Sequence, residues 1–292
     1  MSIQKLQEKI RKLKNPSVIS FDILQKHIPP HLLEQEGKLS DAYGRFCAEL
    51  LEGLKGTIPA VRFSYDTFAL SGENGLRMLL KVMKFAKSCG YYVMLDSVQS
   101  LSAQSAEFAA SMLLDAEQKL PFDALCISSY IGSDGIKPYL TAVRDQDKDL
   151  FATVRTANRS APELQDLLTG SRLVYTATAD MVYHIGEPFV MRGGYSHVAG
   201  IGAATSADCL RTLRSKYPAM FLLVDGYENP GANAKNCSEA FDRIGHGAVV
   251  CAGSSVTAAW MAQDGDEDEY VALAVKAAER MKRNLLRYVE IL

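Results

Sequence analysis

The sequence predicts a closed (β/α)8 barrel, the TIM-barrel fold, with one extra N-terminal helix. Eight short apolar runs alternate with longer amphipathic stretches, and most runs are unbroken, as in parallel strands that helices cover on both faces. No G-x-G-x-x-G motif follows the first run, where an open dinucleotide-binding sheet would carry one. The 292 residues suit one such barrel, so we expect a single domain over residues 1–292.

The expected elements follow in chain order. The charged, amphipathic segment 1–14 is predicted to be a helix, and it lacks the apolar centre of a secretory signal. The expected strands are Ser17–Phe21, Pro59–Phe63, Tyr91–Leu95, Phe122–Ser128, Leu150–Arg155, His197–Gly202, Met220–Val224 and Ala248–Cys251. The expected helices between them include Asp41–Leu54, Gly75–Ser88, Ala103–Glu117 and Ser206–Ser215. The acidic run Asp264–Glu269 suits a loop or the start of the last helix, where negative charge favours the helix dipole.

Composition excludes several classes of partner. The net charge of -2 gives no basic excess for nucleic acid, and no run of 18 apolar residues spans a membrane. The six cysteines are scattered without a C-x-x-C pair, which is typical of a reduced, cytoplasmic protein. The sequence has no H-E-x-x-H motif, no clustered His and Cys, no nucleophile elbow and no P-loop. We therefore expect no metal site and no cofactor.

Polar residues stand at the predicted carboxyl ends of the strands, where barrels of this kind place their ligand sites. They are Asp22, Arg62, Asp96, Ser128, residues 156–158, Asp225, Gly226, Ser254 and Ser255. This set predicts a polar mouth for a small-molecule ligand but is not by itself a catalytic set. Asp22 and Asp96 also suit helix caps, and Asn158 suits a turn.

The order and spacing of these strand ends resemble the longer bacterial form of orotidine 5'-phosphate decarboxylase, from about Ser17 to Ala259. The segments that carry the resemblance are Asp22 with Pro29-Pro30-His31-Leu32-Leu33, Arg62-Phe63-Ser64 with Phe68 and Gly75, Tyr130-Ile131-Gly132-Ser133-Asp134 with Pro138-Tyr139-Leu140, Arg155-Thr156-Ala157-Asn158 with Leu164-Gln165-Asp166, and Ala204-Thr205 with Leu210, Leu213-Arg214 and Pro218. Their joint order implies that family's barrel fold and its decarboxylase chemistry, that of a carbon–carbon lyase in pyrimidine biosynthesis.

The catalytic positions that the resemblance implies are mostly replaced. The family uses a lysine on the second strand and an Asp-x-Lys-x-x-Asp segment after the third, whose last Asp enters the neighbouring subunit's site. Here the second-strand lysine is Arg62, and the segment keeps Asp96 but has Val98 for the lysine and Leu101 for the donated Asp. Valine carries neither a proton nor a charge, and the high pKa of arginine makes it a poor proton donor. Asp96 and Arg62 are therefore remnants of the catalytic set.

The positions that the resemblance assigns to substrate binding are also changed. The family's phosphate loop is matched by residues 225–232, where Asp225 and Glu228 add negative charge that repels a phosphate and Pro230 replaces a glutamine. The phosphate-binding arginine after the eighth strand is Ser255, and the base-contacting serine is Ala157. The substrate-binding positions that remain are Asp22, Thr156, Asn158, Gly226 and Gly231.

Two interpretations of function follow. The chain is a non-catalytic binding or regulatory paralogue that has lost orotidine 5'-phosphate decarboxylation, or it is a repurposed barrel enzyme, of lyase or metal-assisted type, that uses Asp96, Arg62 and an acidic mouth including Asp66. Genuine but atypical decarboxylation is a third possibility. A plugged mouth favours the first interpretation, and an open mouth with convergent carboxylates favours the second. The family's shared site also implies a homodimer with the apolar Leu101, Val98 and Phe63 at its interface.

Overall fold

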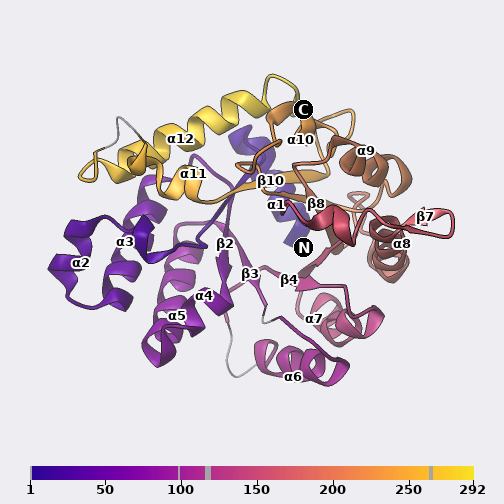
Figure 1. The fold of residues 1–292 in the computed structure, drawn as a ribbon, viewed down its shortest axis with the longest axis horizontal. Helices are drawn as coiled ribbons and strands as arrows, with labels where there is room; N and C mark the ends of the chain where they lie inside the picture. Colours follow the sequence, from indigo (N-terminus) through magenta and orange to yellow (C-terminus); the bar gives the residue numbers. More distant parts are fainter. Residues whose placement is uncertain (1, 98, 116–119, 263–265) are drawn as a thin grey trace.

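The computed structural model describes residues 2–97, 99–115, 120–262 and 266–292. Its barrel strands are β1 (Ser17–Ser20), β2 (Ala60–Ser64), β3 (Tyr92–Asp96), β4 (Ala124–Ser128), β5 (Asp149–Thr153), β8 (Val198–Ala203), β9 (Leu222–Asp225) and β10 (Ala248–Ala252). They close in the order β1-β10-β9-β8-β5-β4-β3-β2, and every neighbouring pair is parallel (Figure 1). The predicted (β/α)8 barrel is confirmed, and all eight expected strands lie within two residues of their predicted bounds.

Helices surround this barrel, and a short hairpin interrupts the pattern. The helices are α1 (Ser2–Leu13), α2 (Pro30–Glu36), α3 (Leu39–Gly53), α4 (Tyr65–Ala69), α5 (Gly72–Ser88), α6 (Ala103–Leu113), α7 (Leu140–Asp145), α8 (Val174–Gly186), α9 (Ala207–Lys216), α10 (Ala234–Ser238), α11 (Ser254–Thr257) and α12 (Tyr270–Leu285). Strands β6 (Leu168–Thr169) and β7 (Arg172–Leu173) form an antiparallel hairpin outside the barrel, which the sequence did not predict. Helix α6 ends earlier than predicted, and residues 116 and 117 of its expected range lie outside the described residues.

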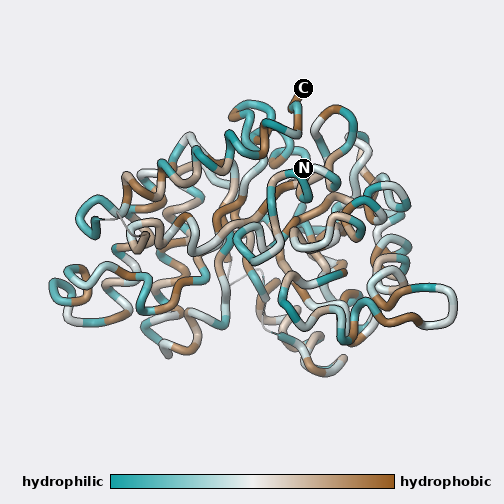
Figure 2. Tube along the Cα trace, turned by 45° about the horizontal axis from the view of Figure 1, so that its top comes forward, coloured by the Kyte–Doolittle hydropathy of each residue, from teal (hydrophilic) through white to brown (hydrophobic). Residues whose placement is uncertain are grey.

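The core follows from the pattern of apolar residues. Strands β1, β8 and β10 are buried at every position, which explains why their sequences do not alternate. The outer helix α12 buries one face, with Tyr270, Ala274 and Met281 among its buried residues, and Figure 2 shows hydrophobic and hydrophilic residues alternating along its trace. Inside the barrel, the rings of Phe151 and Phe221 pack edge to face with centroids 6.2 Å apart. Among the residues that the structure describes, no helix is long and apolar enough to cross a membrane.

The extra helix α1 covers the end of the barrel opposite the mouth. Its apolar face buries Ile3, Leu6 and Ile10, while Lys9 Nζ donates to the carbonyl of Gly90 just before β3, at 2.6 Å. The backbone N–H of Gly247, just before β10, donates to Gln7 Oε1 at 3.3 Å. Since contacts from α1 reach the amino ends of separate strands, this helix covers that end of the barrel.

A buried polar network reinforces the same closed end. Asp149, at the start of β5, accepts hydrogen bonds from the hydroxyl of Tyr92 and from Nδ1 of His197. Asp149 is 1 % exposed and His197 is 5 % exposed, so a carboxylate without these partners would be costly there. The network joins β3, β5 and the residue before β8, and it belongs to the scaffold.

Candidate ligand site at the barrel mouth

A polar pocket of about 340 Å³ opens at the carboxyl ends of the strands. Its lining residues are Ser20, Asp22, Arg62, Thr156, Ala157, Asn158, Asp225, Gly226, Glu228, Asn229, Cys251, Gly253 and Ser254. The prediction that Asp22, Arg62, Asn158 and Asp225 meet at one rim is confirmed, and Asp96 joins them through its contact with Arg62. The pocket's volume lies within the range of about 300–1,000 Å³ that is typical of small-molecule sites.

Arg62 projects from β2 into the barrel and is held by two carboxylates. Its Nε lies 2.7 Å from Asp96 Oδ1 on β3, and its Nη1 lies 3.2 Å from Asp225 Oδ1 on β9. Burial by itself lowers the pKa of the guanidinium, but Asp96 and Asp225 outweigh burial and raise that pKa well above its usual value. Arg62 is therefore a fixed cation that neither donates a proton nor stands free for a ligand anion.

Glu228 reaches across the mouth from the loop after β9. Its Oε2 accepts backbone N–H groups of Gly253 and Ser255, at 3.1 and 2.9 Å, and its Oε1 lies 3.5 Å from Ser254 Oγ. Gly253 lies between β10 and α11, and Ser254 and Ser255 are the first two residues of α11. The carboxylate thus occupies the backbone donors that a ligand anion would otherwise use on this side of the pocket.

The remaining acids of the mouth differ in position. Asp22 follows β1, lines the pocket and accepts a hydrogen bond from Thr67 Oγ1 at 2.8 Å, whereas the helix-cap alternative for it finds no support. Asp66, on α4, does not line the pocket, and burial together with the charge of Asp96 raises the pKa of its carboxyl. Among the described residues, no group of three or more His, Cys, Asp or Glu side chains is placed to hold a metal ion.

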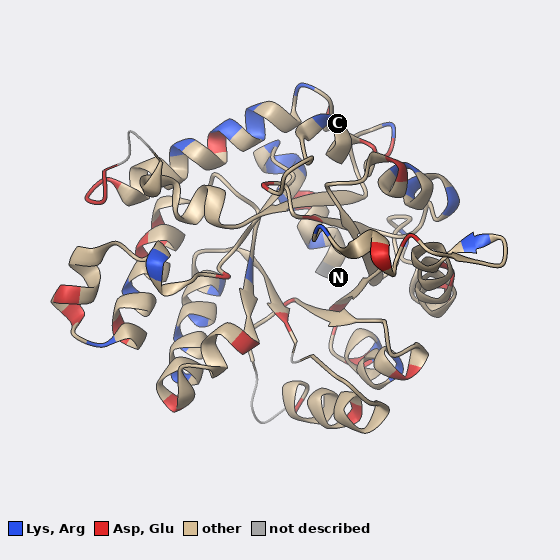
Figure 3. Ribbon diagram, viewed as in Figure 1, with Lys and Arg blue, Asp and Glu red and all other residues tan. Residues whose placement is uncertain are grey.

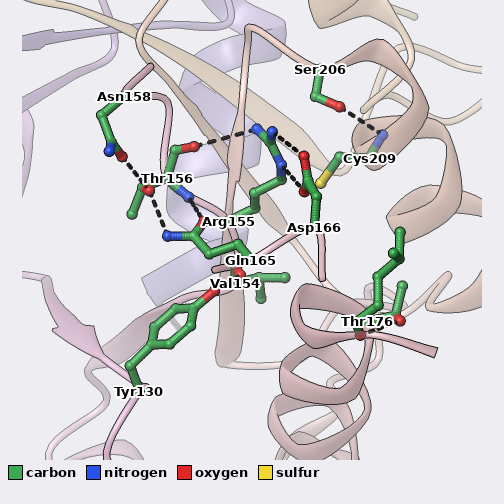
Figure 4. A network of polar contacts seen from close by, with 11 residues as sticks. Tyr130, Val154, Arg155, Thr156, Asn158, Gln165, Asp166, Thr176, Ser206 and Cys209 are labelled. Carbon is green, nitrogen blue, oxygen red and sulfur yellow. Dashed lines mark hydrogen bonds and ion pairs between the residues drawn. The ribbon is translucent and has the colours of Figure 1, made fainter. Parts of the chain in front are cut away.

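Thr156 and Asn158 are positioned by a network behind the rim (Figure 4). Gln165 accepts from the Thr156 backbone N–H and donates to Thr156 Oγ1, both at 2.8 Å, and the threonine hydroxyl donates to Asn158 Oδ1. Arg155 forms a two-pronged ion pair with Asp166, with both N–O distances 2.8 Å. Asn158 also serves in a turn, as the alternative for it predicted, since its carbonyl accepts the N–H of residue 161; its role in substrate binding stays a prediction.

Backbone geometry explains the glycine at position 226. Gly226 has φ of +77°, and a Cβ there would lie 2.3 Å from the Cβ of Ala157 across the pocket. The loop is then tied to the opposite side by Asn229, whose Nδ2 donates to the carbonyl of Ala157 at 3.0 Å. Gly231, predicted to bind substrate, is not among the residues that line the pocket; its carbonyl accepts from Asn236 Nδ2.

Several lining residues escaped the sequence-based prediction. Ser20, Asn229, Cys251 and Gly253 line the pocket without having been singled out. Ser20 and Cys251 lie inside apolar runs, where sequence alone suggests core positions. Burial raises the pKa of the Cys251 thiol, and the neighbouring Asp225 adds to that effect, which favours the protonated thiol.

The three residues predicted to lie at a dimer interface differ in how the structure describes them. Val98 lies outside the described residues. Leu101 is 88 % exposed, as an interface residue in a single chain would be. The prediction that Phe63 lies at the interface is wrong, because its side chain is fully buried and stacks on Phe21 with ring centroids 5.2 Å apart.

Comparisons with known proteins find relatives over nearly the whole chain. The orotidine 5'-phosphate decarboxylase of Clostridium kluyveri is 25 % identical over 288 residues, which cover 98 % of each chain, and that of Rhodopirellula baltica is 28 % identical over 221 residues, covering 74 % of this chain and 73 % of the relative. Among solved structures, the orotidine 5'-monophosphate decarboxylase of Plasmodium berghei superposes with a TM-score of 0.77 at 12 % identity, covering 97 % of this chain and 98 % of the other. The decarboxylase of Leishmania donovani superposes with a TM-score of 0.70 at 21 % identity, covering 97 % and 99 %. No protein-family model matches the chain.

Proposed function

We propose that this homologue of the orotidine 5'-phosphate decarboxylases does not decarboxylate orotidine 5'-phosphate, and that its open barrel mouth binds a small polar ligand without a phosphate group. The observation that carries the proposal is the position of Glu228. In the family resemblance, residues 225–232 match the phosphate-binding loop. Here that loop supplies a carboxylate to the backbone N–H groups of Gly253 and Ser255, so an internal anion holds the donors.

The reaction centre supports the same proposal. Decarboxylation in the family relies on a lysine that stabilises and protonates the carbon left by the carboxylate, and Val98 stands at that position. Among the described residues, Arg62 is the one cation that lines the pocket, and it is paired with Asp96 and Asp225. Loss of a general acid costs about 10²–10⁴-fold in rate, and loss of preorganised charge adds to this.

The chemistry of the pocket favours an uncharged or cationic ligand. Of the residues that the structure describes, three carboxylates line it, from Asp22, Asp225 and Glu228, against the single guanidinium of Arg62. Hydroxyl and amide groups of Ser20, Thr156 and other lining residues supply hydrogen bonds. A phosphate dianion would meet net repulsion, whereas a polyhydroxylated or amine-bearing molecule would not.

Binding experiments test this proposal. Wild-type protein should give no calorimetric heat with UMP at millimolar concentration. Glu228→Ala frees the two N–H groups and removes one charge, so we expect UMP affinity at least roughly tenfold above that of wild type, which corresponds to about 1.4 kcal/mol. Glu34→Ala, which removes an exposed carboxylate on α2, is the matched control and should leave UMP affinity unchanged. Micromolar UMP binding by the wild-type protein would overturn the proposal.

A repurposed enzyme is the second candidate, and the open mouth favours it. An inert scaffold has no need of a solvent-accessible pocket lined by hydroxyls, amides and carboxylates. A ligand found by binding screens should therefore be incubated with the protein and followed for chemical change. Turnover that Asp22→Asn or Asp225→Asn abolishes would favour the enzyme, and unchanged ligand would favour the binding protein.

We also propose that the chain acts as a cytoplasmic homodimer. Leu70, Leu101 and Phe108 are 90 %, 88 % and 67 % exposed, and burying one such side chain contributes about 1.5–3 kcal/mol. In a mixed dimer with an intact decarboxylase, one site would lack the proton-donating lysine and the other the donated Asp. Co-expression should then lower the partner's specific activity or leave it unchanged, and an increase would contradict the assignment of Val98 and Leu101.

A further inference from the structure

A second polar groove lies on the outer surface, between α10 and the carboxyl end of α12. It measures about 540 Å³ and is lined by Tyr227, Ala232, Asn233, Ala234, Lys235, Asn284, Arg287 and Tyr288. No carboxylate is among these lining residues, in contrast to the three that line the mouth. The groove and the mouth share only the loop after β9, which presents Tyr227 to the groove and Glu228 to the mouth.

The cations of this groove have no partners. Within the described part of the chain, the side chains of Lys235 and Arg287 form neither ion pairs nor hydrogen bonds. Some other surface arginines are paired, as Arg77 is with Glu73 at 2.6 Å and Arg211 with Glu239 at 3.0 Å, so what sets Lys235 and Arg287 apart is that both line one groove. The surroundings are basic as well, since α12 carries four Lys and Arg against one Glu, and Figure 3 shows this along its carboxyl half. The groove therefore offers two free positive charges.

Neutral donors and aromatic rings complete the set. Asn233 uses Oδ1 to cap α10, accepting the N–H of Asn236 at 2.8 Å, so its Nδ2 stays available as a donor. The backbone N–H of Tyr227 donates to the carbonyl of Cys251 at 3.2 Å, and its side chain lines the groove together with Asn284. Tyr288, which also lines the groove, is 53 % exposed. Two rings beside two cations suit a ligand with both a planar ring and an anionic group.

We propose that this groove binds a small aromatic phosphate monoester. Arginine and lysine bind phosphate oxygens through charge-assisted hydrogen bonds, arginine in a two-pronged geometry, while the tyrosine rings contact the planar part of the ligand. The volume fits a molecule of this size. The site does not depend on the function of the mouth, which repels the same ligand through its carboxylates.

Three probes separate the two parts of the proposal. ¹⁵N-labelled protein is titrated with phenyl phosphate, inorganic phosphate and phenol at low ionic strength. We expect phenyl phosphate to bind at least tenfold more tightly than either fragment and to shift the amide signals of residues 227, 233–235 and 284–288. Equal affinity for inorganic phosphate would overturn the role of the rings. Signal changes confined to Thr156, Asn158 and their neighbours would place the ligand in the mouth and overturn the proposal.

Matched charge variants complete the test. Lys235→Gln with Arg287→Gln removes both groove cations, and phenyl phosphate affinity should fall at least tenfold. The control is Lys276→Gln with Lys282→Gln, which removes the same charge from α12 at positions that do not line the groove. The control should keep its affinity to within a factor of two. Equal losses of phenyl phosphate affinity in both double variants would mean that general electrostatic attraction holds the ligand, and would overturn the proposal of a specific binding site.

Discussion

Removing the charge of Arg62 should destabilise the barrel strongly. Its side chain is 14 % exposed and that of Asp96 is 18 % exposed, so both charges are largely withdrawn from water. Arg62→Met keeps most of the volume but leaves Asp96 and Asp225 facing each other without a cation. The lost ion pair is buried, and the two remaining carboxylates repel each other.

The magnitude follows from the distances. At 2.7 Å from Asp96 and 3.2 Å from Asp225, the gross attractions are about 6 and 5 kcal/mol at an effective dielectric constant of about 20. Desolvation of the charges offsets much of this, and Asp225 is 37 % exposed, so solvent screens its share. Breaking a buried pair on one side typically costs about 3–5 kcal/mol, and we expect Arg62→Met to fall in that range.

Urea denaturation followed by circular dichroism measures the free energy of unfolding. The double variant Arg62→Met, Asp96→Asn should recover most of the loss, because it removes the more buried of the two carboxylates and leaves Asp225, which is 37 % exposed, without a like charge facing it. Arg77→Met is the control, since its pair with Glu73 is exposed and worth about 0.3–0.5 kcal/mol. A cost below about 1 kcal/mol for Arg62→Met would show that this ion pair does not hold the barrel centre.

Three further predictions follow from other contacts. The hydrogen bond from Arg155 lowers the pKa of Asp166, so the ionised Asp166 contributes its full share to the free energy of unfolding above about pH 4, and this share is lost as the pH falls below that value. Asp166→Asn should therefore lower the free energy of unfolding, measured by urea denaturation, by about 1–2 kcal/mol at pH 7. The difference from wild type should shrink on acidification. Light scattering should give about twice the 32.0 kDa chain mass at micromolar concentration, and Leu101→Asp should shift the protein toward monomer; a monomeric wild type would contradict the interface. Restoring the family residues as Val98→Lys, Leu101→Asp and Ser255→Arg should yield at most slight decarboxylation, and full activity would show that the remaining acids of the mouth do not oppose the phosphate.

The barrel was predictable because its strands are buried on both faces. Uninterrupted apolar runs such as β8 and β10 carry no alternation, and their bounds differed from prediction by at most two residues. The hairpin of β6 and β7 was missed because two-residue strands leave no periodic signal. Phe63 was misplaced for a related reason. Its neighbour Arg62 points into the barrel, and sequence alone does not show which way a phenylalanine beside a polar residue faces.

The sequence predicted which residues line the site better than it predicted which of them bond to one another. Strand ends bring Asp22, Arg62 and Asp225 to one rim in any barrel of this type, so position along the chain was enough. The docking of Glu228 onto two backbone N–H groups depends on how the loop after β9 folds back. Sequence indicated only that this acid repels phosphate, whereas the structure places its carboxylate on the donors themselves.

The most direct test of the central claim is turnover of orotidine 5'-phosphate by the purified dimer or monomer. Loss of the orotate chromophore is followed spectrophotometrically, with an authentic decarboxylase of a Clostridium relative assayed alongside as the positive control. Because Val98 replaces the proton-donating lysine and Glu228 occupies the anion donors, the rate should not exceed the background without protein. Turnover on the order of 1 s⁻¹ or faster, typical of enzymes, would contradict the account.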